Sequence, residues 1–243
     1  MKRSLLALLL ALNALPAAAL YDGWFDTYFA EAAFETNRRQ NERNYEAWYG
    51  KASPAETRPD ASRKNVDRYQ SSASISAEID GQMIQTLRER LKSTGHYNDQ
   101  SEAQLRQLQA SGFINQIRAA LQSDGYDPNS VATAMAYMAT VNYGIAAGQD
   151  LRQLKAHGLV KQLQQAMTSD GYMQGLGDGD KQRMADTFYW LASLQMGMYL
   201  EASAAGNQAA LQSLAQEANG ILKALNLSVD KLRNGSNGLE LVR

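Results

Sequence analysis

The chain has 243 residues, no cysteine, and 24 basic against 25 acidic side chains, for a formal net charge of −1 at pH 7. This near balance gives no electrostatic basis for binding nucleic acid or an anionic membrane surface. Without cysteine the chain forms no disulfide, and its length is ample for one hydrophobic core.

Residues 1–19 have the pattern of a secretory signal peptide. Lys2 and Arg3 precede an apolar run over residues 5–15, which Pro16 and three alanines follow. A short basic region, an apolar run of about ten residues and a small-residue cleavage site together direct export. Cleavage after Ala19 predicts a periplasmic or secreted bacterial protein, with no transmembrane segment left in the mature chain.

Residues 20–50 are rich in aromatic side chains. Several of them lie three or four positions apart, so a helix would place them in one stripe. Exposed aromatic side chains are costly in water and are frequent in protein contacts. We therefore predict a protein-binding segment, with these candidate residues: Trp24, Phe25, Tyr28, Phe29 and Trp48. Packing of the segment onto its own chain is an equal alternative.

The next segment, residues 51–74, holds serines, prolines and basic residues but almost no apolar side chain, which is typical of a flexible linker. From residue 75 onwards apolar side chains recur with helical spacing, and no stretch alternates as a strand does. The sequence thus predicts an all-α helical bundle over residues 75–243. Ser101 starts a capping-box pattern, and Asp127-Pro128 is typical of another helix start.

Two stretches of the predicted bundle, residues 105–126 and 151–172, agree at 12 of 22 positions without a gap. We interpret them as a duplication with units over residues 105–147 and 151–203. Each unit would be an amphipathic helix, a Ser-Asp-Gly-Tyr turn and a more apolar second helix. Glycine in the turn favours the left-handed conformation that ends a helix, so the repeated Asp-Gly-Tyr is interpreted as a stop signal rather than a site.

The second helix of each unit is apolar on nearly all faces, which predicts a central, buried position. Gly144 and Gly197 occupy equivalent positions there and suggest a close approach of two backbones. Asn142 and Gln195 are also equivalent, which predicts buried amides that fix the register of the helices.

The duplication also allows candidate metal and catalytic residues to be compared between copies. Apolar or aromatic residues replace the methionines that could bind copper, which favours core packing: Met135, Met138, Met196 and Met198. His157 aligns with Ser111, and His96 has only sequence neighbours to suggest a triad. The loop over residues 175–180 lacks the lysine of a phosphate loop and the glutamate of a calcium loop. We predict no cofactor, metal ligand or catalytic residue.

The stretch Asn-Ser-Val-Ala-Thr-Ala-Met-Ala-Tyr at residues 129–137 resembles an uncharacterised family of bacterial secreted proteins, a domain of unknown function. The resemblance runs from about Ser74 to Leu239 and includes a Leu-Asn-Leu…Asn-Gly-Leu tail. It implies an exported helical domain and brings no known activity or catalytic residues.

These patterns predict an exported, non-enzymatic binding or interaction protein. One alternative is a cell-envelope hydrolase whose carboxylates come together from separate helices. Another is a small-molecule binder with space between the central helices, where Asn142 and Gln195 would be the specificity groups.

Overall fold

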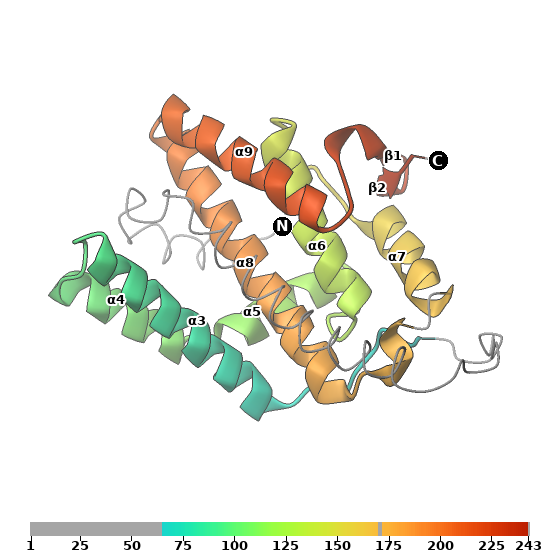
Figure 1. The fold of residues 1–243 in the computed structure, drawn as a ribbon, viewed down its shortest axis with the longest axis horizontal. Helices are drawn as coiled ribbons and strands as arrows, with labels where there is room; N and C mark the ends of the chain where they lie inside the picture. Colours follow the sequence, from blue (N-terminus) through green and yellow to red (C-terminus); the bar gives the residue numbers. More distant parts are fainter. Residues whose placement is uncertain (1–64, 170–171, 243) are drawn as a thin grey trace, which may run out of the picture.

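The computed structural model describes residues 65–169 and 172–242, and 70% of the residues it describes are helical (Figure 1). The predicted signal peptide and the aromatic segment lie outside these residues. The α-helices are α3 (Ala73–Ser93), α4 (Asp99–Ala110), α5 (Phe113–Ser123), α6 (Val131–Ala146), α7 (His157–Ser169), α8 (Asp178–Ala204) and α9 (Gln208–Ala224). The short 3-10 helix η2 (Tyr172–Gly175) precedes α8. A second one, η3 (Val229–Lys231), precedes the strands β1 (Leu232–Gly235) and β2 (Gly238–Leu241).

The longest helix, α8, crosses the middle of the molecule (Figure 1). α6 makes its most extensive contacts with α8 and α9. α3 packs on α8, and α4 lies alongside α3. α7 lies beside α6 and contacts the small β-sheet. The predicted all-α class is confirmed, and α6 and α8 have the central, buried positions that their composition predicted.

The largest fully buried side chain among the described residues is that of Trp190 in α8. Its ring centroid lies 4.1 Å from that of Phe113 in α5. Its indole N–H donates to Oδ1 of Asp80 in α3 at 2.6 Å. Because a buried tryptophan needs a partner for its N–H, this one side chain fixes the relative positions of three helices.

Glycine ends α5 as the sequence predicts. Gly125 has a φ of +85°, its N–H donates to the Gln122 carbonyl, and the Tyr126 N–H donates to the Leu121 carbonyl. These two bonds form a Schellman motif, in which a left-handed residue turns the chain out of the helix. The equivalent Gly171 lies outside the described residues.

Two helix starts differ from the predicted ones by a few residues. α4 is capped by Asn98, whose Oδ1 accepts the Ser101 N–H at 2.9 Å while the Ser101 hydroxyl accepts the Asn98 N–H. Ser101 is thus the third residue of the helix and not its cap. α6 is capped by Ser130 and not by Asp127, because Pro128 and Asn129 form a turn and the helix begins only after Ser130.

The residues just before α6 pair with the chain that leads into α3, through an antiparallel bridge between Ser130 and Arg68. The Tyr69 N–H donates to the Asn129 carbonyl at 3.1 Å, and the Val131 N–H donates to the Asp67 carbonyl at 3.0 Å. Asp67 and Tyr69 are buried. The end of the predicted linker, from residue 65, therefore packs against the helical domain.

The β-hairpin was not predicted from the sequence. Each strand has four residues, which is too short for an alternating pattern to be recognised. The strands are antiparallel, with Leu232 opposite Leu241 and Gly235 opposite Gly238.

The two aligned copies share only part of their secondary structure. α5 and α7 are both helices, but residues 105–110 belong to α4, whereas the aligned residues 151–156 form a turn and a loop. The duplicated helix–turn–helix unit therefore remains a prediction from the sequence.

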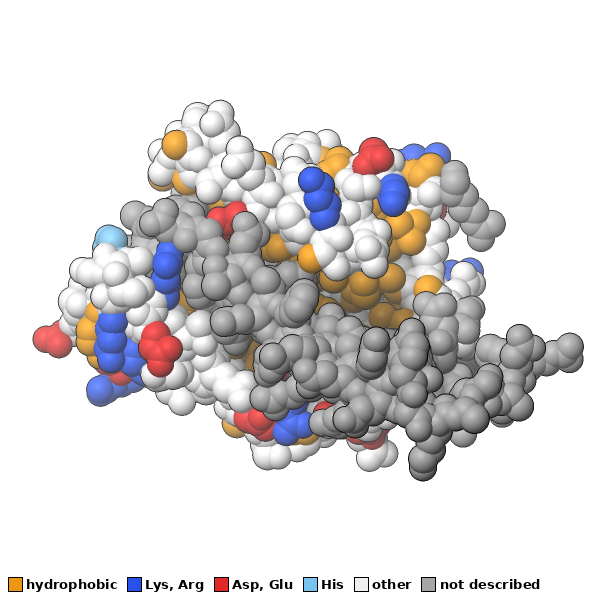
Figure 2. All heavy atoms as spheres, viewed as in Figure 1, with side chains coloured by type: hydrophobic (Ala, Val, Ile, Leu, Met, Phe, Trp, Pro, Cys, Tyr) orange, Lys and Arg blue, Asp and Glu red, His pale blue; other side chains and the backbone are white. Residues whose placement is uncertain are grey.

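The surface shown in Figure 2 mixes basic and acidic side chains without separating them by sign. Apolar side chains gather in a hollow below α9 on this face (Figure 2). The mixture agrees with the near-balanced composition and gives this face no single-sign patch.

Candidate functional site

The two predicted amides of the described region, Asn142 in α6 and Gln195 in α8, are fully buried. Asn142 Nδ2 donates to the Met138 carbonyl at 2.8 Å in its own helix. Asn142 Oδ1 and both amide atoms of Gln195 have no hydrogen-bond partner in the described part of the chain. The amides are buried as expected, but no hydrogen bond joins them. The other candidates, Trp24, Phe25, Tyr28, Phe29 and Trp48, lie outside the described residues.

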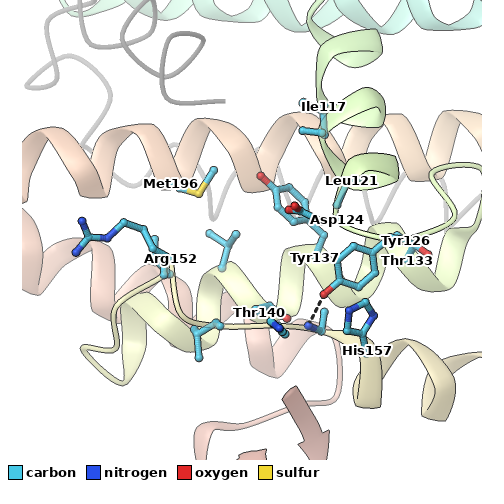
Figure 3. A pocket seen from close by; sticks show the side chains of 16 residues that line it. Ile117, Leu121, Asp124, Tyr126, Thr133, Tyr137, Thr140, Arg152, His157 and Met196 are labelled. Atoms are coloured by element: carbon cyan, nitrogen blue, oxygen red, sulfur yellow. Dashed lines mark hydrogen bonds between the residues drawn. The ribbon is translucent and has the colours of Figure 1, made fainter. Parts of the chain in front are cut away.

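A pocket of about 240 Å³ lies between α5, α6, α8 and the loop that leads from α6 to α7 (Figure 3). A dry cavity of roughly 150 Å³ holds a benzene molecule, whereas drug-sized ligands occupy pockets of roughly 300–1,000 Å³. The volume therefore suits a compact organic molecule. The apolar part of the wall includes Ile117, Leu121, Val141, Leu151, Leu154 and Met196.

One face of α6 supplies the polar part of the wall. Thr133, Tyr137 and Thr140 follow one another at helical spacing, so they lie on the same side of the helix. The Tyr137 hydroxyl bonds to the Ser193 hydroxyl of α8 at 3.1 Å, and burial raises the pKa of Tyr137 to about 12. The Oγ1 atoms of Thr133 and Thr140 are buried and have no partner among the described residues. This face thus keeps hydrogen-bonding capacity that the described protein groups do not use.

Tyr126, just after the α5 stop signal, lines the pocket beside His157 (Figure 3). Its Oη accepts the Ala156 N–H at 2.8 Å, and its ring stacks on the His157 imidazole with centroids 4.2 Å apart. Burial raises the pKa of Tyr126, so the phenol stays protonated at neutral pH and its own O–H can donate to another group. The Asp-Gly-Tyr turn is therefore a stop signal, as predicted, that also supplies a residue to the site.

The loop between α6 and α7 packs against Gly144 of α6. A Cβ added to Gly144 would lie 2.2 Å from Leu151 Cδ2 and 2.8 Å from Leu154 Cδ1. The predicted close approach at Gly144 therefore occurs, but with leucine side chains of the loop and not with a second helix backbone. The missing side chain lets both leucines cover α6 and form part of the pocket wall.

The β-hairpin holds the loop and α7 from the other side. The Leu239 N–H donates to the Lys155 carbonyl at 2.7 Å. The Gln162 side chain of α7 accepts the Leu241 N–H at 2.6 Å and donates to the Leu241 carbonyl at 3.2 Å. The position of the loop thus depends on contacts with α6 and with β2.

Charged residues of the pocket lie at its edge. Asp124, Arg152 and Lys155 are exposed lining residues, and Arg152 extends away from the other labelled side chains in Figure 3. Arg152 binds Asp150 through two bonds, Nε–Oδ1 at 2.9 Å and Nη2–Oδ2 at 2.8 Å. These bonds hold the pKa of Asp150 at about 2. The edge therefore carries one ion pair, one further cation and one further acid, whose charges nearly cancel.

A separate cluster of buried polar residues joins α3, α5 and α8. Arg118 donates to Asp186 Oδ1 at 2.6 Å and to the Ser76 hydroxyl at 3.1 Å. Gln182 donates to Asp186 Oδ2 at 3.2 Å and to the same hydroxyl at 3.0 Å. Burial raises the pKa of Asp186, and the charge of Arg118 opposes that rise. These groups bond mainly to one another, with Arg118 Nε left without a partner among the described residues, and they join three helices, so we interpret the cluster as a structural one.

Within residues 65–169 and 172–242, no helix combines the length and hydrophobicity that a membrane span requires. No group of three or more His, Cys, Asp or Glu side chains there is arranged to hold a metal ion. His157 lies at the pocket, while Met196 is a buried part of its apolar wall.

The pocket could not be predicted from the sequence, because its walls come from segments up to 79 positions apart in the chain, residues 117–196. One local signal was present. Thr133, Tyr137 and Thr140 place three hydroxyls on one face of a helix that is otherwise nearly all apolar. Such a face is unusual for a buried helix, because each hydroxyl there needs a partner.

No curated protein and no solved structure is significantly similar to the chain. The chain does match a family of unknown function, DUF6683, over residues 2–242. This match begins well before Ser74 and so includes the aromatic segment and the linker, which the sequence resemblance left out. On this match the chain belongs to the family of unknown function DUF6683.

Proposed function

We propose that the protein is an exported, non-enzymatic binding protein that takes up a compact organic molecule in the pocket between α5 and α6. The observation that carries the proposal is the pocket wall itself. Apolar side chains from four elements face a row of hydroxyl residues, of which Thr133 and Thr140 have no partner among the described residues. Binding sites for small molecules combine apolar walls with a few polar groups in this way.

Binding is better supported than hydrolysis by paired carboxylates. Among the 16 lining residues, Asp124 is the single acid, and it is exposed at the edge. Acid–base hydrolysis of a glycosidic bond uses two carboxyl groups on either side of the substrate. None of the buried acids of the described residues lines the pocket; Asp80 and Asp186, for example, accept hydrogen bonds from Trp190 and Arg118 in the core.

The proposal of export is supported by the signal-peptide pattern of residues 1–19. The proposal of a protein partner is supported by the aromatic residues of segment 20–50. Deleting residues 20–50 tests the partner. We expect the deletion to abolish capture of a specific envelope protein while the melting temperature is unchanged. Lower stability with no loss of a captured protein would show that the segment packs on its own chain instead.

Two neighbouring alanines of α5 test the pocket. Ala120 lines it, whereas Ala119 is exposed beside it. Ala120→Phe places a ring in the pocket, and Ala119→Phe adds the same ring outside. The full chain is screened against small organic compounds at millimolar concentration by thermal shift, since a bound ligand raises the melting temperature. We expect some compounds to raise the melting temperature of the natural chain and of Ala119→Phe, and to leave that of Ala120→Phe unchanged. Stabilisation that survives in Ala120→Phe, or none with any compound, would contradict the proposal.

A further inference from the structure

We infer that the ligand of this pocket is an uncharged molecule with an apolar body and a hydrogen-bond acceptor oxygen, such as a ketone, ester or alcohol. The inference rests on the proposed function and names the chemical class that the pocket would select. Three features of the wall lead to it: the free donor of Tyr126, the placing of the charges and the balance of apolar and polar side chains.

The acceptor follows from Tyr126. Its Oη already accepts the Ala156 N–H, so the remaining capacity of the hydroxyl is its proton. Tyr126 lines the pocket and is half-buried, so a ligand that enters covers this proton. A buried donor without a partner is costly, and an acceptor on the ligand removes that cost.

The absence of charge on the ligand follows from where the pocket's charges lie. Thr133, Tyr137 and Thr140 in the wall are neutral side chains. The charged lining residues Asp124, Arg152 and Lys155 are all exposed, and Arg152 is already neutralised by Asp150. A carboxylate or ammonium group pushed among these neutral groups would lose its hydration and gain no opposite charge. An uncharged polar group loses less hydration and finds hydroxyl partners.

The apolar body follows from the rest of the wall. Leu121 of α5, Leu151 of the loop and Met196 of α8 meet at the pocket from different elements. Apolar ligand surface that they cover is removed from water, which favours binding. The volume of about 240 Å³ accommodates a single ring with a short substituent.

Four probes of similar size separate these requirements: acetophenone, benzoate, benzylammonium and toluene. Acetophenone is uncharged with an acceptor, toluene is uncharged without one, and the other two carry a charge. Binding to the full chain is followed by NMR, from shifts of backbone amides in residues 117–126, 133–141 and 151–157. We expect acetophenone to bind about three- to tenfold more tightly than toluene, the worth of one hydrogen bond. Benzoate and benzylammonium should bind at least about tenfold more weakly than acetophenone.

Tyr126→Phe tests the assigned donor. It should lower the affinity for acetophenone to that for toluene and leave toluene binding unchanged, which a mere loosening of the loop would not do. Tyr143→Phe is the control, because Tyr143 is a half-buried residue of α6 that does not line the pocket. It should leave the affinities for both probes as they are in the natural chain.

The outcomes separate this inference from the proposed function. A charged probe that shifts the same amides at equal or higher affinity overturns the ligand class while the pocket remains a binding site. Failure of acetophenone to shift them also overturns the ligand class, since it meets every stated requirement. The proposed function fails only when the wider screen finds no compound whose effect Ala120→Phe removes.

Discussion

The guanidinium of Arg118 and the carboxylate of Asp186 lie 2.6 Å apart, inside the contact between α5 and α8. Arg118→Met should lower the free energy of unfolding by about 3–5 kcal/mol, because it leaves a buried carboxylate without its cation. Urea unfolding followed by circular dichroism measures this loss. Arg183→Met is the matched control, since its pair with Glu78 is more than 40% exposed on both sides and contributes under about 1 kcal/mol. Similar losses for the two variants would contradict the structural role of the buried pair.

Two buried glutamines of α8 differ in their hydrogen bonds, and that difference predicts opposite effects of the same substitution. Gln195 has no partner for either amide atom among the described residues. Gln195→Met keeps a similar shape and should leave stability unchanged or raise it by about 1–3 kcal/mol. Gln182 accepts the Ser72 N–H at 2.7 Å and donates to Asp186, so Gln182→Met should lower stability by about 2 kcal/mol. Thermal unfolding of both variants gives the comparison, and a large loss in Gln195→Met would reveal a partner for that amide.

Two helical glycines predict opposite responses to alanine. Gly144→Ala brings a Cβ against Leu151 and Leu154, which must move, so the pocket wall changes and stability falls by about 1–3 kcal/mol. Acetophenone should bind this variant at least about fivefold more weakly, a loss of about 1 kcal/mol. Gly81→Ala has open space around the new Cβ and should raise stability by about 0.5–1 kcal/mol. Calorimetry and the NMR titration measure the two effects, and unchanged binding in Gly144→Ala would argue against the seating of the loop on this glycine.

The pKa of Asp150 tests whether Arg152 and Asp150 form an ion pair at the edge of the pocket. The side-chain hydrogen bonds from Arg152 hold it at about 2, below the ordinary value of 3.8. Because the folded pKa is the lower one, the pair stabilises the fold above about pH 4, and the contribution is lost as the pH falls from 3.8 towards 2. Arg152→Gln should return the pKa of Asp150 towards 3.8 in a carboxyl-detected NMR titration, whereas the distant Arg183→Gln should not move it. A pKa that stays near 2 in Arg152→Gln would assign the effect to the Arg152 backbone N–H, which also donates to Asp150.

The helices and their burial could be predicted from the sequence because they depend on local periodicity. Gly125, for example, ends α5 where the repeated turn predicts a helix end. The start of α6 could not be predicted, because residues 129–131 pair with residues 67–69, a contact that no local pattern reveals.

The candidate site was less predictable than the fold. Asn142 and Gln195 occupy equivalent positions in the two aligned copies, which predicts buried amides, and the structure buries both outside the pocket lining. Tyr126 was interpreted only as part of a turn, because its contact with Ala156 crosses from one segment to another. Which residues line this pocket depends on where the loop between α6 and α7 runs. The sequence of that loop has no hydrophobic periodicity from which its position could be predicted.

The bonds between Gln162 and Leu241 join positions 79 apart in the chain. Since a protein is made from its N-terminus, α5, α6 and the loop leave the ribosome well before β2 does. During that interval the loop lacks the bond that Lys155 later makes with Leu239, and one wall of the pocket has no fixed place. This wall of the pocket is therefore completed only when the C-terminal strand has been made.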